Sequence, residues 1–324
     1  MNIYKVSVCV VTYNHARYIR DCLISVLAQC EDVSLEILVG DDLSEDETGK
    51  IVQSLANRYP KIIRYFCHSK RKGPASNYQF LIRKAQGEYI AHLDGDDLWL
   101  PGKLATQIRF MEQHPDCPAV YSNAITIRDD GVLLGVFNNF QPTRFDINSL
   151  LRHGNFLNHS SMLYRAFLRE DLLRLPPSFL DYRIHLHHAR HGAIGYLNQT
   201  LVSYRVNSSS SMIVHANNDV RRLYWEALLD VPRDSINADD LASGIAEFAR
   251  SIFFRSIRIR HVSLIRQWLP IIIASSPVSR TKMSVLIFSA IIRTGVRELF
   301  AALYAHLSGN SFKILYYRQN DLSK

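Results

Sequence analysis

Three carboxylates follow a short apolar run in residues 87–103, whose sequence is GEYIAHLDGDDLWLPGK. They are Asp94, Asp96 and Asp97, with Gly95 between the first two. A run of about four to eight apolar residues that ends in a turn signal is typical of a buried strand. Acidic side chains at the carboxyl end of such a strand lie where open α/β sheets bind their ligands. Because neighbouring carboxylates repel one another, a divalent cation would stabilise them, and phosphate oxygens would complete its coordination.

A simpler interpretation of the same acids is a turn that caps the following helix and is closed by Trp99 and Pro101. The acidic triplet alone does not distinguish a cation site from a cap. The elements that precede it, and the polar residues at their ends, are therefore needed to interpret it.

Three further strands and three helices are expected before the acidic triplet. The strands are apolar runs at residues 6–11, 35–40 and 62–66, and the first of them is largely β-branched. The helices between the strands end near residues 27, 59 and 85. The resulting β-α-β-α-β-α-β order predicts an α/β fold with a parallel sheet and right-handed crossover connections.

Polar residues follow the first, second and fourth of these strands. Thr12, Tyr13 and Asn14 follow the first strand, and Asp41 and Asp42 follow the second. Because the carboxyl ends of parallel strands meet at one edge of the sheet, these residues and the acidic triplet predict a single ligand site. The sequence after the first strand has neither the glycine-rich dinucleotide fingerprint nor a Walker loop, which argues against hydride transfer and P-loop phosphoryl transfer.

Beyond the acidic triplet the chain is expected to be mixed and then helical. The sequence predicts strands at residues 119–127, 192–197 and 201–205, and a helix from about residue 182 to residue 191. From about Val220 the pattern is helical to the end, with breaks at Pro232, Pro270 and Pro277. These patterns divide the chain into an α/β domain, residues 1–215, and a helical region, residues 216–324.

The composition is that of a globular protein, since 47% of the 324 residues are hydrophobic and 21% are charged. The net charge of +8 is uneven: residues 250–324 hold twelve Lys or Arg and two acids, so the other 249 residues carry a net charge of −2. No stretch reaches the roughly 18 uncharged apolar residues of a spanning helix, and no signal peptide is expected. Five cysteines without CxxC spacing indicate reduced thiols, so we expect a cytoplasmic protein.

The basic region begins with residues 250–266, which interleave arginine with isoleucine and phenylalanine and contain no acid. This pattern predicts either a helix that lies on an anionic membrane surface or a helical subdomain that packs its apolar face on the catalytic domain. The two alternatives are compatible. Nucleic-acid binding is not expected, because no recognised motif supports it.

Four segments together resemble the inverting family 2 glycosyltransferases, which have the GT-A fold. In chain order they are VSVCVVTYNHARYIRDCLISVLAQ, LEILVGDDLSEDET, KGPASNYQFLIRKAQGEYIAHLDGDDLWLPGKLATQ and FLDYRIHLHHARHGAIGYLNQTLVSYRVNSSSS. They span most of residues 5–212 and occur at the spacing of the family. The resemblance implies a nucleotide-sugar donor, usually a UDP-sugar, and a divalent cation, Mn²⁺ or Mg²⁺.

The resemblance assigns several residues of this chain to the nucleotide. Thr12 and Tyr13 would flank the base, with Asn14 in the same nucleotide-binding set, and Asp41 would accept the imide N–H of the base. Asp42 would support that loop or the ribose.

Other residues are assigned to the phosphates and the metal. Lys72 and Asn77 would lie near the nucleotide or its phosphates. Asp94 and Asp96 match the ends of the family's DXD metal motif; Asp96 would bind the metal directly, and Asp94 would contact the ribose and a metal-bound water. Arg205 would pair with a phosphate or, as an alternative, form an internal ion pair.

Inverting transfer needs two kinds of group. A metal that bridges both phosphates stabilises the charge of the departing nucleoside diphosphate, and one base takes the proton of the acceptor hydroxyl from the far side of the sugar. The resemblance gives the role of base to Asp181. The alternative is that Asp181 only caps the helix that begins near Tyr182.

The chain departs from the family pattern at Asn207, where many relatives have histidine, which is a better metal ligand. A group of four histidines is not expected to bind metal, because no Cys or Glu joins it, and is expected to be solvated or lightly buried; its members are His185, His187, His188 and His191. Residues 158–161 are weak candidates for recognition of the acceptor sugar.

We therefore expect a metal-dependent inverting glycosyltransferase, of hexosyl or N-acetylhexosaminyl type, that acts on a glycan or lipid-linked glycan in surface polysaccharide assembly. It would be cytoplasmic, with peripheral contact to the inner face of the membrane through its basic tail. The alternative is a non-catalytic protein that binds a nucleotide sugar or acts as a scaffold at the membrane. A processive synthase and a sugar nucleotidyltransferase are disfavoured, because the sequence lacks their signature segments.

Overall fold

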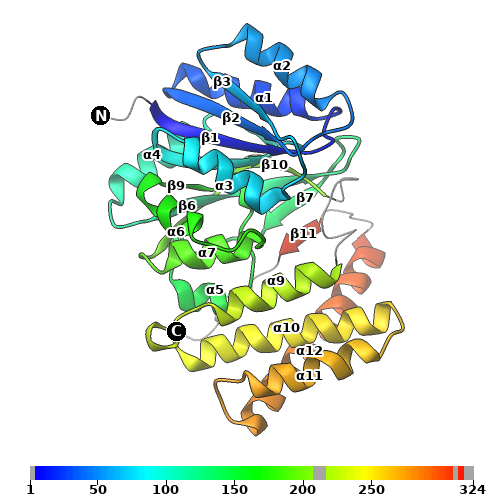
Figure 1. Cartoon of the computed structure of the whole chain (residues 1–324). Helices are drawn as coiled ribbons and strands as arrows, with labels where there is room; N and C mark the ends of the chain where they lie inside the picture. Colours follow the sequence, from blue (N-terminus) through cyan, green and yellow to red (C-terminus); the bar gives the residue numbers. More distant parts are fainter. Residues whose placement is uncertain (1–3, 207–216, 309–312, 317–324) are drawn as a thin grey trace. The chain divides into compact units, whose positions relative to one another are not determined.

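The computed structural model describes residues 4–206, 217–308 and 313–316 of the chain (Figure 1). The chain forms two compact units. The sheet unit comprises Met1–Phe145, Leu157–Tyr224 and Lys313–Lys324, and the helical unit comprises Asp146–Phe156 and Trp225–Phe312. The domain boundary predicted between residues 215 and 216 lies outside the described residues.

The first half of the sheet unit alternates strands and helices as the sequence predicts. Its strands are β1 (Tyr4–Thr12), β2 (Leu35–Asp41), β3 (Ile63–Cys67) and β4 (Gly87–Asp94), and its helices are α1 (Ile19–Leu27), α2 (Thr48–Arg58) and α3 (Pro74–Lys84). The strands lie in the order β3-β2-β1-β4, and every neighbouring pair is parallel. The predicted β-α-β-α-β-α-β order and the parallel sheet are confirmed.

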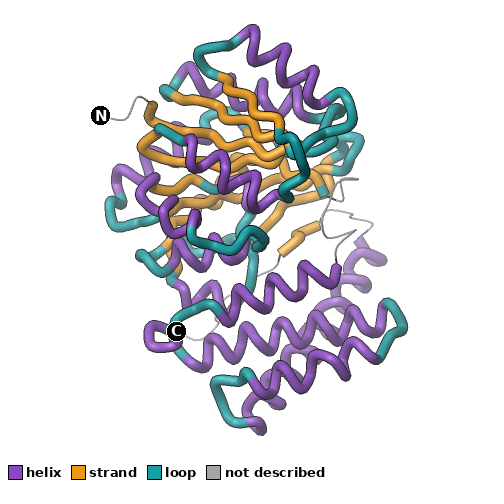
Figure 2. The backbone as a smooth tube through the Cα atoms, viewed as in Figure 1, coloured by secondary structure: helices purple, strands orange, loops and turns teal. Residues whose placement is uncertain are grey.

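The second half extends the same sheet (Figure 2), through five antiparallel pairs and two parallel ones in the described ranges. Its strands are β5 (Leu98–Trp99), β6 (Ala119–Ile127), β7 (Leu133–Asn138), β8 (Arg144–Phe145), β9 (Leu163–Arg165), β10 (Ile194–Arg205) and β11 (Lys313–Tyr316). Strand β9 lies between β4 and β6 and is antiparallel to both, so the chain from residue 157 onward returns into the middle of the sheet. Residues from this return reach the acidic turn.

The remaining elements of the sheet unit are short. They are η1 (Ala28–Glu31), α4 (Lys103–Gln113), η2 (His159–Ser161), η3 (Ala166–Leu168), α6 (Arg169–Leu173), α7 (Asp181–Ala189) and the first part of α9 (Asn217–Leu229). The helical unit holds α5 (Ile147–His153), η4 (Arg233–Ser235), α10 (Ala238–Arg258), α11 (Ser263–Ala274) and α12 (Arg280–Ser308). None of the helices in the described ranges is both long enough and apolar enough to cross a bilayer.

Three expectations from the sequence are wrong. The region beyond Val220 is not helical to the end, because Lys313–Tyr316 forms β11 and pairs with β7. Pro270 lies inside α11 rather than breaking it. The strands predicted at 192–197 and 201–205 are one strand, β10, because register shifts between Leu197 and Val202 absorb the irregularity within its pairing to β6.

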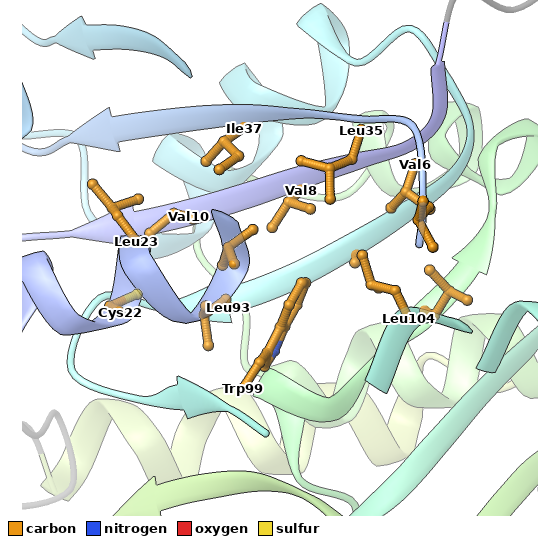
Figure 3. Close-up of a cluster of buried hydrophobic side chains, with 14 of the residues drawn as sticks. Val6, Val8, Val10, Cys22, Leu23, Leu35, Ile37, Leu93, Trp99 and Leu104 are labelled. Carbon is orange, nitrogen blue, oxygen red and sulfur yellow. The ribbon is translucent and has the colours of Figure 1, made fainter. Parts of the chain in front are cut away.

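Buried side chains of β1, β2 and β4 meet those of α1 and α4 in one hydrophobic cluster (Figure 3). The labelled members are Val6, Val8, Val10, Cys22, Leu23, Leu35, Ile37, Leu93, Trp99 and Leu104. The indole N–H of Trp99 donates a 2.8 Å hydrogen bond to the carbonyl of Ser160. The cluster therefore holds the turn after β4 and the segment near Ser160 in fixed positions.

Two adjacent residues of α1 provide a test of this packing. Leu23 is 0% exposed within the cluster, whereas Ile24 is 46% exposed. Leu23→Ala should lower the free energy of unfolding by about 3–5 kcal/mol, because it leaves a cavity in a closed core. Ile24→Ala should lower it by less than about 1 kcal/mol. Urea denaturation of both variants measures the difference, and equal losses would show that α1 does not pack as described.

Candidate active site

The predicted ligand residues meet at the carboxyl edge of the parallel strands. Thr12 is paired with Asp41 across β1 and β2, and Val11 is paired with Asp94 across β1 and β4. The backbone N–H of Asp42 donates to the Thr12 carbonyl at 3.0 Å. The structure thus brings the polar ends of the first, second and fourth strands together, as predicted from the sequence.

The acidic residues form a tight turn whose backbone lies against the end of β1. The N–H of Asp97 donates to the carbonyl of Asp94 at 3.0 Å, which closes the turn. A Cβ atom at Gly95 would lie 2.7 Å from His15 Nδ1 and 2.8 Å from Thr12 Oγ1, so a larger residue would force these two side chains to move. Because Gly95 permits this close approach, the carboxylates on either side of it are held beside β1.

Asp94 has the most accessible carboxylate of the turn, with 43% of its side chain exposed. Its Oδ1 lies 3.0 Å from Nε2 of His92, which is itself buried. Partial loss of hydration around Asp94 opposes ionisation, but the neighbouring His92 and its hydrogen bond, together with His15 and Ser160, hold the pKa of this carboxyl below its ordinary value. Asp94 therefore presents an ionised oxygen at the edge of the sheet.

Asp96 is less accessible, with 14% of its side chain exposed, and its Oδ2 lies 3.9 Å from Nε2 of His15. Among the described residues, no three His, Cys, Asp or Glu side chains are placed to hold a metal ion together. The chain therefore offers the two carboxylates of Asp94 and Asp96. A hard cation such as Mg²⁺ is commonly held by one or two carboxylates, with water and substrate phosphates as its other ligands, so this donor set fits such an ion.

Asp97 has a structural role that the sequence analysis did not assign. Its buried carboxylate accepts hydrogen bonds from the Ser160 hydroxyl at 2.5 Å and from the Arg205 backbone N–H at 2.8 Å. Burial, followed by the negative charges of Asp96 and Asp94, raises the pKa of Asp97 well above its ordinary value. The three acids therefore differ in role: Asp94 and Asp96 face the ligand edge, and Asp97 fixes the turn to η2 and β10.

Asp41 and Asp42 are buried, and both bind neighbouring loops. Asp41 Oδ1 accepts from the N–H and the hydroxyl of Ser44 at 2.8 and 2.6 Å, and its Oδ2 accepts from the Tyr65 hydroxyl at 2.8 Å. Asp42 accepts from the backbone N–H groups of Lys72 and Gly73 at 2.6 and 3.0 Å. Both carboxylates thus shape the loops around the predicted base site, and the contact of Asp41 with the base stays a prediction.

Tyr13 and Asn14 occupy the loop after β1. The Tyr13 ring lies under the guanidinium of Arg71, whose central carbon is 3.5 Å from the ring centroid. Asn14 adopts a left-handed backbone conformation with φ of 54°, which asparagine tolerates better than most residues. Its N–H donates to the Ser44 hydroxyl and its side-chain oxygen accepts from the Glu45 N–H, both at 2.9 Å. Asn14 therefore connects the loops after β1 and β2.

Lys72 and Asn77, which the resemblance assigns to the nucleotide or its phosphates, differ in burial. Lys72 is exposed, and its ammonium nitrogen lies 5.0 Å from the centroid of the Phe80 ring. Asn77 is fully buried; its amide donates to the Gly40 carbonyl at 2.7 Å, and its oxygen lies 2.9 Å from His68 Nε2. Asn77 thus positions the end of β2, and its place near the nucleotide stays a prediction.

Arg205 donates to backbone carbonyls rather than to an acid. Its Nε donates to Asp96 at 3.1 Å, and one terminal nitrogen donates to Arg128 and Asp129 at 3.0 and 3.1 Å. The guanidinium also lies 4.3 Å from the Tyr18 ring centroid. These contacts join β10 to the acidic turn without an internal ion pair among the described residues, and the phosphate contact of Arg205 stays a prediction. Asn207 lies outside the described residues.

Asp181 is the first residue of α7, and Leu180 occupies the N-cap position. Its Oδ1 accepts a 2.7 Å hydrogen bond from the N–H of Tyr182. Burial, and then the negative charge of Asp181, raises the pKa of Tyr121 on β6 well above its ordinary value and raises the pKa of Tyr316 on β11 to about 12. Asp181 therefore lies close enough to β6 and β11 for its charge to act on both tyrosines, and its assignment as base stays a prediction.

A row of buried histidines connects α7 with the acidic turn. His185 Nε2 on α7 lies 3.2 Å from His159 Nδ1, and the ring centroids of His159 and His92 are 4.0 Å apart. His92 in turn contacts Asp94, as described above. The expectation that the α7 histidines are solvated or lightly buried is wrong for His185 and His188, because both face the interior of the sheet unit, where Tyr121 and Tyr164 pack against them.

His159, His185 and His188 are neutral at ordinary pH. Burial, reinforced by His92, lowers the pKa of His185 to about 3. Burial and the neighbouring histidines also lower the pKa values of His159 and His188 well below the ordinary range. His159 and His185 therefore connect α7 with the segment beside Asp94 by packing contacts and not through their charge. Helical spacing places His185 and His188 on one face, but that spacing alone does not show that the face is buried.

Comparison with known proteins assigns the family. A model described as Glycosyl transferase family 2 matches residues 7–173, which is just over half of the 324 residues. The match includes Thr12, Asp41 and the acidic turn. The chain belongs to glycosyl transferase family 2, as the sequence resemblance implied.

Two relatives illustrate the extent of the similarity. An uncharacterised protein of Mycobacterium tuberculosis is 30% identical over 222 residues, which cover 68% of this chain and 63% of that protein. A protein of Rickettsia felis, named as an uncharacterised glycosyltransferase, is 40% identical over 110 residues, which cover 34% of this chain and 18% of that protein. The chain thus spans less than two thirds of the length of these relatives.

The fold is shared with a solved structure. Residues 1–349 of S. aureus TarS align with a TM-score of 0.60 at 20% identity, covering 94% of this chain and 92% of that one. The same part of TarS in complex with UDP-GlcNAc aligns with a TM-score of 0.56 at 18% identity, covering 81% of this chain and 89% of that one. These similarities confirm the predicted α/β fold of the GT-A type.

The role of Asp97 is tested by comparing a neutral isostere with a truncation. Asp97→Asn should cost less than about 1 kcal/mol of stability, because its amide oxygen still accepts hydrogen bonds and the position already favours a neutral group. Asp97→Ala should cost about 1–3 kcal/mol, because it removes the acceptor of two buried donors. Thermal unfolding of the two variants measures this. Equal destabilisation by both would show that Asp97 must be ionised.

The buried histidines predict a pH dependence. Below about pH 6.5 the unfolded chain protonates these side chains, whereas His185 in the fold does so only near pH 3. Stability is therefore fully present above about pH 6.5 and falls as pH decreases toward 3, by up to about 1.4 kcal/mol per pH unit for each such histidine. His185→Phe should remove the contribution of one histidine to the slope of unfolding free energy against pH. Urea denaturation between about pH 5 and about pH 7 measures this slope. An unchanged slope would contradict the burial of a neutral His185.

Proposed function

We propose that this chain is an inverting glycosyltransferase that transfers a hexosyl or N-acetylhexosaminyl group from a nucleotide sugar. The observation that carries the proposal is the meeting of Thr12, Asp41, Asp94 and Asp96 at one sheet edge in a family 2 chain. A UDP-sugar is the donor that we favour, and a TarS structure in complex with UDP-GlcNAc shares this fold.

In the proposed reaction Asp181 accepts the proton of the acceptor hydroxyl. The acceptor oxygen then forms a bond to the anomeric carbon from the face opposite the nucleotide. The carbon–oxygen bond to the diphosphate breaks at the same carbon, so the nucleoside diphosphate leaves with the electron pair and the configuration inverts. A divalent cation held by Asp94 and Asp96, Mn²⁺ or Mg²⁺, would stabilise the charge of the leaving diphosphate as a Lewis acid.

The loops of the edge would bind the nucleotide before the reaction. The Tyr13 ring and the loop held by Asp41 would contact the base, and the basic loop at residues 70–73, which Asp42 fixes, would lie beside the phosphates. Because these loops are held by buried hydrogen bonds, little ordering is needed when the donor binds.

We further propose that the acceptor is a glycan or lipid-linked glycan of a surface polysaccharide, and that the protein works at the inner, cytoplasmic face of a membrane. The basic excess of residues 250–324 supports this location, because anionic lipid attracts Lys and Arg. The competing proposal is a non-catalytic protein that binds a nucleotide sugar or acts as a scaffold.

Consumption of the donor separates these two proposals. With a panel of nucleotide sugars and Mn²⁺, the wild-type protein should release nucleoside diphosphate from one of them. Asp181→Asn should bind that nucleotide with unchanged affinity and react roughly 10²–10⁴-fold more slowly, because an amide does not accept the proton. Binding without turnover in the wild type would favour the scaffold, and full turnover by Asp181→Asn would refute the base assignment.

A further inference from the structure

Helix α12 has two apolar faces, and only one of them is covered within the helical unit. Met283 and Ala290 are buried, on the side where α12 packs beside α10. A second set of apolar residues recurs at intervals of three or four and is 47–65% exposed; its members are Val285, Phe288, Ile292, Val296 and Leu299. The second set, here called the outer stripe, runs about 21 Å along one face of the helix.

Other exposed apolar residues lie in the segment that precedes the outer stripe in the chain. Half of the large apolar side chains that are exposed in the described ranges lie between residues 257 and 299. Besides the outer stripe, they are Ile257, Ile259, Val262, Leu269 and Ile271. Single exposed apolar residues are common, but a continuous row of them marks a surface that binds something.

The same segment is strongly basic. Residues 250–299 contain nine Lys or Arg and one acid, Glu298. Lys282 and Arg293, which belong to α12, bind Asp239 and Glu247 of α10 at 2.6 and 3.1 Å. Arg258, Arg260 and Arg266 are exposed. With nine basic residues and one acid, the segment that carries the outer stripe therefore has a net charge of +8.

We propose that the outer stripe of α12 docks the protein on an anionic phospholipid bilayer, with the helix lying in the plane of the interface. A helix with an apolar face and a basic border binds in this way, because apolar side chains enter the acyl boundary while Lys and Arg stay among the headgroups. A second copy of the chain is disfavoured as the occupant, because it would bring two positively charged surfaces together. This inference deepens the membrane contact of the proposed function and does not depend on the catalytic assignment.

Residues 250–266, for which the sequence predicts either membrane contact or packing within a helical subdomain, differ from the outer stripe in their exposure. Within residues 250–266, Ile252 and Leu264 are buried in the helical unit. Arg250 pairs with Glu247 at 2.7 Å. The alternation of arginine with apolar residues there reflects packing within the unit as much as exposure, whereas the outer stripe of α12 is exposed along its length.

Flotation of the full-length protein with vesicles tests the proposal. The wild type should bind vesicles of equal parts phosphatidylglycerol and phosphatidylcholine, and should bind vesicles of phosphatidylcholine alone roughly tenfold more weakly. The double substitution Phe288→Glu and Ile292→Glu should weaken binding to the anionic vesicles by roughly tenfold or more. Phe288→Ser with Ile292→Ser, which adds no charge, should also weaken it.

The matched control is Phe140→Glu, because Phe140 is 72% exposed in the sheet unit and outside the basic segment. It should bind vesicles like the wild type. All variants should keep the wild-type melting temperature and nucleotide affinity. A failure of the membrane proposal can then be distinguished from a failure of the catalytic proposal. Vesicle binding that is absent in the wild type, or unchanged in both α12 variants, would overturn the inference. So would a wild-type dimer that the α12 substitutions dissociate without lipid.

Discussion

The repulsion among three carboxylates in one four-residue turn is the constraint on which the sheet edge depends. The structure relieves it by giving each acid a different environment. Asp97 is buried and bonded to Ser160 and to the Arg205 backbone, where its pKa is raised. Asp94 keeps an exposed, ionised oxygen because His92 stabilises its charge. What remains at the surface is a pair of carboxylates that suits one hard cation.

The rest of the edge holds these carboxylates in position. Gly95 lets the turn approach the end of β1, and the buried acids Asp41 and Asp42 fix the neighbouring loops. The histidine row from His185 to His92 joins helix α7, which carries Asp181, to the same turn. The loops after β1 and β2, the acidic turn and the start of α7 are therefore joined by contacts of buried side chains, and such contacts would preorganise the proposed site.

The sequence predicts the strand order and the location of the site because both follow from local patterns. Apolar runs mark the parallel strands, and parallel strands place their carboxyl ends together. The sequence does not predict how the three acids divide their roles, because Ser160 and Arg205 reach Asp97 only after β9 returns into the sheet. For the same reason the burial of Asn77 and the carbonyl contacts of Arg205 appear only in the structure: they depend on residues distant in the chain.

The most direct test is a calorimetric titration of UDP into the protein with and without Mn²⁺. It compares the wild type with Asp96→Ala and with the control Asp116→Ala, whose carboxylate pairs with Arg144 away from the edge. We expect Mn²⁺-dependent binding that Asp96→Ala weakens by roughly tenfold, about 1.4 kcal/mol, and that Asp116→Ala leaves unchanged. Absence of nucleotide binding, or equal affinity in Asp96→Ala with Mn²⁺ present, would contradict this expectation.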